Sequence, residues 1–283
     1  MILVADSGST KTTWVATDQH HTLCIVDTPG LNPHTTDPQL FADSCAKVVA
    51  RLDHADFEHT QLFFYGAGCG TAKSQDQVAA LLSHSFPGAH IQVEGDLLAA
   101  CRALCGHRQG LVGILGTGSN LCFYDGTHIA DSNPSLGFLV GDEGSANHIG
   151  KKLIKSFFDR SMPDDLRQLF ALSFDLELPH VLDQLYHSPQ PNRYLGSLAP
   201  FACHHRHHPF VEHLLNESFT DYCTYQIVPV ARRQDCHTVS LVGSIAEIFQ
   251  PEIAAALAPH GLTISKTLKE PILGLAEYHQ DKQ

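Results

Sequence analysis

The feature that most constrains the fold is a pattern that occurs twice: a short apolar strand, a glycine turn and a second strand. Residues 2–18 (ILVADSGSTKTTWVATD) show it first, and residues 110–131 (GLVGILGTGSNLCFYDGTHIAD) show it again. In the second copy, Asp125-Gly126 predicts a further hairpin turn. A repeat of this kind predicts two domains with similar topology.

The rest of the chain alternates strands and helices. Three strands in succession, followed by strand–helix alternation, predict a mixed sheet flanked by helices. We expect the boundary between the two domains near 106–110. Apolar runs predict strands at 2–5, 12–18, 22–28, 61–65, 89–94, 238–242 and 262–267. Helical patterns occur at 38–52, 75–85 and 97–105, and over 145–226 with breaks at Pro163, Pro179, Pro189 and Pro191.

Size and charge exclude several classes of function. A chain of 283 residues can bury a sizeable core and suggests about two domains. The formal net charge of −12, with only 18 lysines and arginines, argues against broad contact with nucleic acid. No stretch approaches the roughly 20 apolar residues of a membrane span, and the N-terminus lacks the residue order of a signal peptide. We therefore expect a cytoplasmic protein that contacts no membrane and no nucleic acid.

Cysteine and histidine usage indicates no metal centre. The 9 cysteines are scattered without a CxxC pair, so reduced thiols are expected in place of a disulfide framework or a four-thiolate zinc site. Cys101 and Cys105 lie one helical turn apart and are best explained as small buried hydrophobes. The segment CHHRHHP at 203–209 is favoured as a solvated surface segment, with metal binding at 204–208 left as the alternative.

The first glycine turn admits two interpretations. Asp, Ser and Gly are common turn residues, so a plain hairpin needs no function behind it. Alternatively, backbone N–H groups from Gly8 to Thr10 form an anion-binding concavity, and Lys11 adds a positive charge. Asp6 then holds a hydrated divalent ion.

Two more glycine turns follow predicted strands. GTGSN spans 116–120, and LVGSIAEIF at 241–249 passes through Gly243-Ser244 into a helix, which lets the backbone approach a flat ring or sugar. A nucleotide lodged between two similar domains needs one turn from each side, and DSGSTKT and GTGSN supply such a pair. No P-loop is present, because Gly150-Lys151 has Ser145 where the first glycine of that motif belongs.

Eight short segments run in one order over nearly the whole chain, and their combination is more specific than any member. They are ADSGSTKT at 5–12, GLNP at 30–33, YGAGC at 65–69, EGDLLAA at 94–100, GILGTGSN at 113–120, GDEGSA at 141–146, LVGSIA at 241–246 and EPILGLA at 270–276. In this combination the chain resembles the BadF/BadG/BcrA/BcrD ATPase family. Within that family it is similar to the N-acetylglucosamine kinase-like branch of the sugar kinase, actin and heat-shock chaperone superfamily.

The resemblance implies an α/β fold of two ribonuclease H-like (actin-like ATPase) domains with a central cleft that closes over ATP and Mg²⁺. It implies an N-terminal domain over 1–107, joined by a C-terminal helix at 270–283. The C-terminal domain then covers 108–269 and contains a helical insertion. The implied partner is a small-molecule sugar, and a homodimer is left open.

The resemblance also assigns roles to individual residues. It implies that Asp6 positions the metal through water and that Asp96 is the base. The nucleotide would contact Gly8, Ser9, Thr10, Lys11, Gly116, Thr117, Gly118, Gly243 and Ser244. The sugar would contact Asn32, Asp96, Ser119, Asn120, Ser135, Leu136, Gly137 and Asp142.

General chemistry supports the role of Asp96 independently. Phosphoryl transfer to a hydroxyl needs positioning, charge neutralisation and one carboxylate that orients the hydroxyl and accepts its proton. Asp96 ends a predicted strand and opens a helix, which is also the place of a helix N-cap, its alternative role. Asp142 could likewise be an acid in the first turn of a helix, and Asn32 could simply hold a turn.

Two positions depart from the family pattern. Thr13 stands where related bacterial sequences often carry an acid, which changes the surroundings of the first turn. The segment SLGF at 135–138 replaces the Gly-Trp-Gly of animal N-acetylglucosamine kinases, so an indole wall is missing. The preference for the 2-substituent of the sugar therefore cannot be carried over from those kinases.

We expect an ATP-dependent kinase of an amino sugar, with N-acetylglucosamine phosphorylated at its 6-hydroxyl as the first candidate. One alternative is an ATPase activator of a 2-hydroxyacyl-CoA dehydratase type enzyme, although the cysteines show no pattern for an iron–sulfur cluster. The other is a non-catalytic ATP-binding regulator, which would have little need of Asp6, Asp96 and Asp142 together. The sequence leaves these alternatives open.

Overall fold

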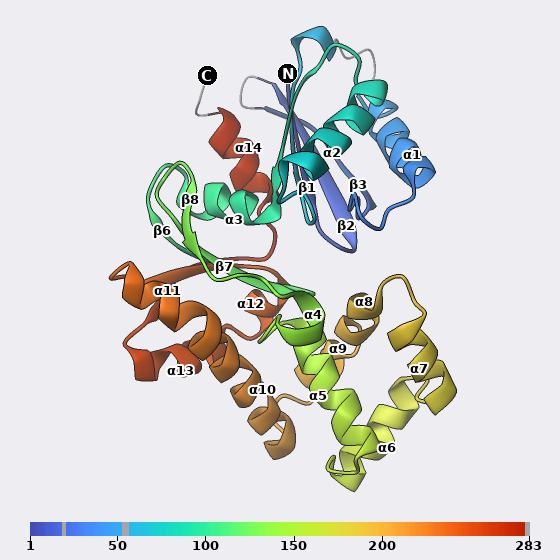
Figure 1. Ribbon diagram of the computed structural model, residues 1–283, viewed down its shortest axis with the longest axis vertical. Helices are drawn as coiled ribbons and strands as arrows, with labels where there is room; N and C mark the ends of the chain where they lie inside the picture. The colour runs from blue at the N-terminus through green and yellow to red at the C-terminus, as the bar shows by residue number, and fades with distance from the viewer. Residues whose placement is uncertain (19–20, 53–56, 281–283) are drawn as a thin grey trace. The chain divides into compact units, whose positions relative to one another are not determined.

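The computed structural model describes residues 1–18, 21–52 and 57–280. The chain divides into two compact units: unit 1 is Met1–Arg108 with Glu270–Gln283, and unit 2 is Gln109–Lys269. Each unit contains a five-stranded mixed sheet with helices packed on it (Figure 1). The predicted α/β class with mixed sheets is confirmed.

In unit 1 the strands lie in the order β3-β2-β1-β4-β5. The first three pair antiparallel, whereas β4 is parallel to β1 and β5 is parallel to β4. The strands are β1 (Ile2–Ser7), β2 (Lys11–Asp18), β3 (His21–Pro29), β4 (Gln61–Gly66) and β5 (His90–Gly95). The helices are α1 (Pro38–Val49), the 3₁₀ turn η1 (Phe57–His59), α2 (Ala72–Ser85), α3 (Asp96–Cys105) and α14 (Ile272–Gln280).

Side chains alternate between the two faces of this sheet. Leu3 and Ala5 of β1 belong to a core shared with α1 and α2, in which Trp14 is fully buried. Phe63 of β4 points to the other face, where His279 of α14 stacks on it at a ring-centroid distance of 3.6 Å. In Figure 1, α1 and α2 cover one face and α3 and α14 the other. The last helix of the chain is therefore packed into unit 1.

Unit 2 repeats the topology of unit 1. Its strands are β6 (Gly110–Leu115), β7 (Ser119–Tyr124), β8 (Ile129–Ser132), β9 (Thr238–Val242) and β10 (Thr263–Leu268), in the order β10-β9-β6-β7-β8. Strands β6, β7 and β8 pair antiparallel, β9 is parallel to β6, and β10 is parallel to β9. When β6 to β10 are matched in turn with β1 to β5, the two sheets have the same strand order and the same strand directions. The repeat visible in the sequence is thus a repeat of strand topology.

The helical stretch predicted over 145–226 is six separate α-helices, and proline lies at the start of five of them. Pro163 is the N-cap of α6 (Asp164–Ser173), Pro191 is the first residue of α8 (Pro191–Gly196) and Pro179 is the second residue of α7 (Leu178–Tyr186). In the first turn of a helix the N–H that proline lacks would have no partner within the helix. Within the described residues no helix combines the length and apolar character needed to cross a membrane. The helices of unit 2 are α4 (Gly137–Val140), α5 (Ala146–Phe158), α6 (Asp164–Ser173), α7 (Leu178–Tyr186), α8 (Pro191–Gly196), α9 (Ala199–His204), α10 (Pro209–Tyr222), the π-helical η2 (Cys223–Ile227), α11 (Val228–Arg233), α12 (Ser244–Ile248), α13 (Gln250–Leu257) and the 3₁₀ turn η3 (Ala258–His260).

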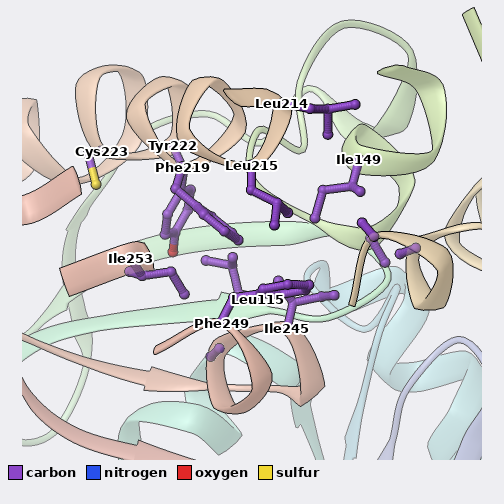
Figure 2. Packing of buried hydrophobic residues seen from close by; sticks show 14 of the residues in the cluster. Leu115, Ile149, Leu214, Leu215, Phe219, Tyr222, Cys223, Ile245, Phe249 and Ile253 are labelled. Carbon is purple, nitrogen blue, oxygen red and sulfur yellow. The ribbon is translucent and has the colours of Figure 1, made fainter. Parts of the chain in front are cut away.

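Tyr222, the last residue of α10, packs on two glycines. Its hydroxyl donates to the carbonyl of Asn120 at 3.1 Å and occupies the space that a Cβ on Gly113 would need. A Cβ on Gly144 would lie 2.8 Å from the Cβ of Tyr222. These contacts tie α10 to the sheet and to the turn before α5. Figure 2 shows the apolar side chains around this point, among them Leu115, Phe219, Ile245, Phe249 and Ile253.

Gly150 sets the crossing of α5 and α8, and its replacement tests this packing. A Cβ at Gly150 would overlap the carbonyl oxygen of Leu195. Because that atom is backbone, Gly150→Ala must push the helices apart, and we expect a loss of about 1–3 kcal/mol in the free energy of unfolding. Thermal unfolding should show a lower midpoint, whereas Gly70→Ala, whose Cβ meets no atom within 4 Å, should unfold near the wild-type temperature. Equal midpoints for both variants would contradict the crossing described here.

Candidate active site

The first glycine turn joins β1 to β2 and is held by two buried hydroxyl groups. The N–H of Gly8 donates to the carbonyl of Lys11 at 2.9 Å, which closes the turn. The Ser7 and Thr12 hydroxyls lie 2.8 Å apart, and Ser7 Oγ accepts the N–H of Leu31 at 2.9 Å. Both side chains are fully buried. The turn is therefore fastened to the segment that follows β3.

Gly30 allows that segment to lie directly on the turn. Its N–H donates to the carbonyl of Thr10 at 3.1 Å. A Cβ on Gly30 would overlap the carbonyl oxygen of Gly8 and lie 2.8 Å from the backbone of Ser9. Only glycine fits such a backbone-to-backbone approach. This role of Gly30 was not predicted from the sequence, in which its place two residues before Asn32 in GLNP is the one available signal.

Lys11, predicted to bind phosphate, makes ion pairs with two carboxylates of unit 1. Its Nζ lies 2.9 Å from Glu270 Oε1 and 3.7 Å from Asp27 Oδ1. The hydrogen bond to Glu270 is the main cause of a raised pKa for Lys11. Asp27 also accepts the hydroxyl of Thr13 at 2.8 Å, so Thr13 contributes a donor where an acid was noted in relatives. The lysine is thus charged and oriented by its neighbours.

Asp6 and Asp96 form a partly buried carboxylate pair. The pKa of Asp6 is raised to about 7, first by burial and then by Asp96 and Glu270, against the lowering effect of Lys11. Burial also raises the pKa of Asp96, while the N–H groups of Leu97 and of Asp96 itself oppose that rise. Carboxylates that repel one another in this way favour either a bound proton or a nearby cation.

The donor set around Asp6 fits a hydrated divalent ion. Among the described residues, no group of three or more His, Cys, Asp or Glu side chains could hold a metal ion by itself. Mg²⁺ commonly keeps several waters and binds through one or two carboxylates together with phosphate oxygens. A partly buried carboxylate with a raised pKa, beside further carboxylates, is compatible with such a cation and would be stabilised in its charged form by it.

Asp96 is the first residue of α3, and it is not the cap of that helix. The N-cap is Gly95, and no side chain caps this helix end. The alternative prediction that Asp96 is the helix N-cap is therefore wrong, because the N-cap lies one residue earlier. A carboxylate in the first turn is still favoured by the helix dipole.

Asn32 holds a turn, which was predicted from the sequence as the alternative to sugar binding. Its Oδ1 accepts the N–H of His34 at 2.9 Å, and its own N–H donates to Thr36 Oγ1 at 2.8 Å. The side chain also lies against Gly68, where a Cβ would approach Oδ1 at 2.6 Å. This structural role leaves the side-chain amide nitrogen as the group that a ligand could engage.

The second glycine turn joins β6 to β7 and is held by the start of α5. The carbonyl of Gly116 accepts the N–H of Ala146 at 2.9 Å. The carbonyl of Thr117 accepts two hydrogen bonds from Asn147, at 3.1 Å from its backbone N–H and at 2.7 Å from Nδ2. The N–H of Gly116 donates to the carbonyl of Gly118 at 3.0 Å. This role of Asn147 was not predicted from the sequence, because the residue lies 30 positions after the turn that it holds.

Asp142 lies beside this turn and is held by two donors. Its Oδ1 accepts the N–H of Ser119 at 3.2 Å, and its Oδ2 accepts Asn147 Nδ2 at 2.8 Å. A Cβ on Gly118 would come within 2.9 Å of Oδ2, so glycine is needed there. Asp142 has a φ of 60°, a conformation that Asp tolerates better than most residues. Its carboxylate is thereby fixed, and each oxygen keeps further acceptor capacity.

The third glycine turn packs on the second. Gly243 has a φ of 126°, and a Cβ there would overlap the carbonyl of Leu115 and lie 3.1 Å from the N of Gly116. Its N–H donates to the carbonyl of Leu268 at 2.9 Å. Ser244 follows as the first residue of α12. Both predicted nucleotide turns of unit 2 therefore meet at one point.

The remaining predicted sugar contacts of unit 2 differ in environment. Ser119 is buried, and its hydroxyl has no hydrogen-bond partner among the residues described. Asn120 uses its Oδ1 for the N–H of Leu121 at 2.9 Å. Ser135 and Leu136 are exposed, and Gly137, with a φ of 68°, opens the short helix α4 that leads to Asp142.

The histidine segment at 203–209 takes structural roles. His208 caps α10, because its Nδ1 accepts the N–H of Phe210 at 3.1 Å. Arg206 forms a bidentate ion pair with Glu252 and lies over the ring of Phe249. In the described part of the chain, these side chains form no candidate metal group, and the nine cysteines are thiols.

Comparison with models of protein families, and with curated proteins, gives no match. A solved structure described as a "putative N-acetylglucosamine kinase" from Porphyromonas gingivalis is 32% identical, with 99% of each chain covered and a TM-score of 0.92. The chain belongs to the family of that protein. A second such kinase, from Chromobacterium violaceum, is 17% identical over 98% of each chain, with a TM-score of 0.75. A ROK family glucokinase from Streptomyces griseus, solved with glucose and AMPPNP, is 14% identical over 97% of this chain and 98% of its own, with a TM-score of 0.56. The family fold is thus the two-domain, actin-like fold of sugar kinases.

The raised pKa of Asp6 predicts a pH dependence of stability. In the unfolded chain Asp6 loses its proton near pH 3.8, whereas in the folded protein it holds the proton until about pH 7. Between these values the folded state binds more protons, so its stability falls as the pH rises from about 4 to about 7. Asp6→Asn should remove this loss and stabilise the ligand-free protein at neutral pH, by on the order of 2–4 kcal/mol. Denaturant unfolding of both proteins at several pH values checks this, and a variant less stable than wild type at pH 7.5 would contradict it.

Proposed function

We propose that this protein is an ATP-dependent kinase that phosphorylates an amino sugar, with N-acetylglucosamine and its 6-hydroxyl as the first candidate. The observation that carries the proposal is the equivalence of the β1–β2 and β6–β7 turns, which occupy the same place in two sheets of identical strand order. Membership of the family of the Porphyromonas gingivalis protein supports the sugar kinase class. The motif order supports a place in the BadF/BadG/BcrA/BcrD family as well.

The nucleotide is assigned to the glycine turns. No acceptor among the described residues takes the N–H groups of Ser9 and Thr10, or those of Thr117 and Gly118, so these groups are available to phosphate oxygens. Asp6 would hold Mg²⁺, which supplies charge neutralisation when bound. The residues assigned to the nucleotide are Gly8, Ser9, Thr10, Lys11, Gly116, Thr117, Gly118, Gly243 and Ser244.

The sugar is assigned to a set of short polar side chains. The Asp142 carboxylate, fixed by Ser119 and Asn147, is suited to accept hydrogen bonds from neighbouring hydroxyls. A site of this kind rejects partners that leave its buried groups unpaired. The residues assigned to the sugar are Asn32, Asp96, Ser119, Asn120, Ser135, Leu136, Gly137 and Asp142.

Asp96 is assigned the role of base. Its carboxylate orients the sugar hydroxyl and accepts its proton as the oxygen attacks the γ-phosphorus, while the bond to the β–γ bridging oxygen breaks and ADP leaves. Burial raises the pKa of Asp96, which makes it a stronger proton acceptor than a solvated carboxylate.

A substrate panel tests the proposed function. Glucose, glucosamine, N-acetylglucosamine, N-acetylmannosamine and muramic acid derivatives are each incubated with Mg-ATP, and ADP release and product mass are measured. We expect one amino sugar to gain a phosphate with one ADP released for each product. Steady ATP hydrolysis that no sugar alters would overturn the proposal in favour of an ATPase role.

Replacement of Asp96 tests its role as base. Asp96→Asn keeps the shape of the side chain and removes its basicity, so we expect kcat to fall by about 10²- to 10⁴-fold with little change in sugar affinity. A suitable control is Asp37→Asn, because Asp37 caps α1 through Gln39 and asparagine caps equally well. Near wild-type turnover in Asp96→Asn would return that residue to a structural role.

A further inference from the structure

Asn147 is fully buried at the start of α5, and one side-chain NH₂ group serves two acceptors. Nδ2 donates to the carbonyl of Thr117 at 2.7 Å and to Asp142 Oδ2 at 2.8 Å. Its Oδ1 is buried and has no hydrogen-bond partner within the described residues. The side chain thus joins the glycine turn to the carboxylate assigned to the sugar.

The direction of two peptide groups follows from these bonds. The carbonyls of Gly116 and Thr117 both point to the start of α5, where Ala146 and Asn147 donate to them. In a trans peptide the C=O and N–H groups point in opposite directions, and the described peptide bonds include no cis bond. The N–H groups of Thr117 and Gly118 therefore point away from α5, side by side. Two consecutive N–H groups directed to one side form a concavity that accepts an anion.

We propose that Asn147 is the positioning residue of this anion-binding turn: it holds the Thr117 carbonyl so that the N–H groups of Thr117 and Gly118 face the nucleotide phosphates. The inference rests on the proposed nucleotide role of the turn. Because the same NH₂ group also donates to Asp142, it links the orientation of the turn to that of the carboxylate proposed to bind the sugar.

The chemistry of the position explains why an amide is needed. Both groups that contact Nδ2 are acceptors, so the side chain must offer two donors from one atom, which the NH₂ of asparagine does. An aspartate at 147 would place its carboxylate oxygens against the Thr117 carbonyl and the Asp142 carboxylate, which are both acceptors. An apolar side chain would remove the hydrogen bond that Asp142 Oδ2 accepts.

Binding of ADP with Mg²⁺, measured by calorimetry without any sugar, tests the inference. We expect Asn147→Ala to bind ADP about tenfold more weakly than wild type, since the side-chain hydrogen bond to the Thr117 carbonyl is lost together with the one to Asp142, and only the backbone N–H of residue 147 still holds the turn. Asn147→Ser keeps one donor and should bind with intermediate affinity. Adenosine, which has no phosphate, should bind wild type and both variants equally.

Ser156→Ala is the matched control, because Ser156 is buried on the same helix and donates only to Leu153 within that helix. It should bind ADP like wild type. Wild-type ADP affinity in folded Asn147→Ala would overturn the inference. Equally weakened binding of ADP and of adenosine would also overturn it, because it would indicate general damage to unit 2. Failure of wild type to bind ADP would also overturn it. Normal ADP binding without transfer to any sugar would overturn only the proposed kinase function.

Discussion

Direct packing of backbone on backbone fixes the two glycine turns proposed to bind the nucleotide, and the rest of the candidate site depends on it. Gly30 lies on the Gly8–Ser9 peptide in unit 1, and Gly243 lies on the Leu115–Gly116 peptide in unit 2. A side chain at either position would displace the turn beneath it. Because these contacts involve no movable side chain, they hold the turns rigidly, and a rigid turn keeps its N–H groups directed at a ligand without reorganisation.

Charge in unit 1 is arranged around the first turn in a way that suits phosphate chemistry. Asp6, Asp96 and Glu270 concentrate negative charge, and Lys11 is the cation paired with Glu270. Without ligands this cluster is costly, as the raised pKa of Asp6 indicates. A cation accompanied by phosphate would relieve this repulsion, which agrees with the proposed binding of Mg-nucleotide.

The strand pattern and the glycine turns could be predicted from the sequence, because both rest on local signals. Short apolar runs predicted most strands to within two residues, and the repeated strand–turn–strand pattern corresponds to two sheets of equal order. Contacts between distant segments could not be predicted in this way. The partner of Lys11 is Glu270, 259 residues away, and Asn147 gains its role only from the fold of the turn 30 residues before it. The predicted breaks at Pro163, Pro179 and Pro191 coincide with helix starts, whereas the starts of α9 and α10 at Pro200 and Pro209 were not predicted.

The central claim is that phosphate moves from ATP to a sugar and not to water. Its most direct test follows ATP labelled at the γ-phosphate with radioactive phosphorus, in the presence and absence of the sugar that the protein accepts. We expect the label to pass into a sugar phosphate, with little inorganic phosphate formed when the sugar is absent. Label released as inorganic phosphate at the same rate with and without sugar would contradict it.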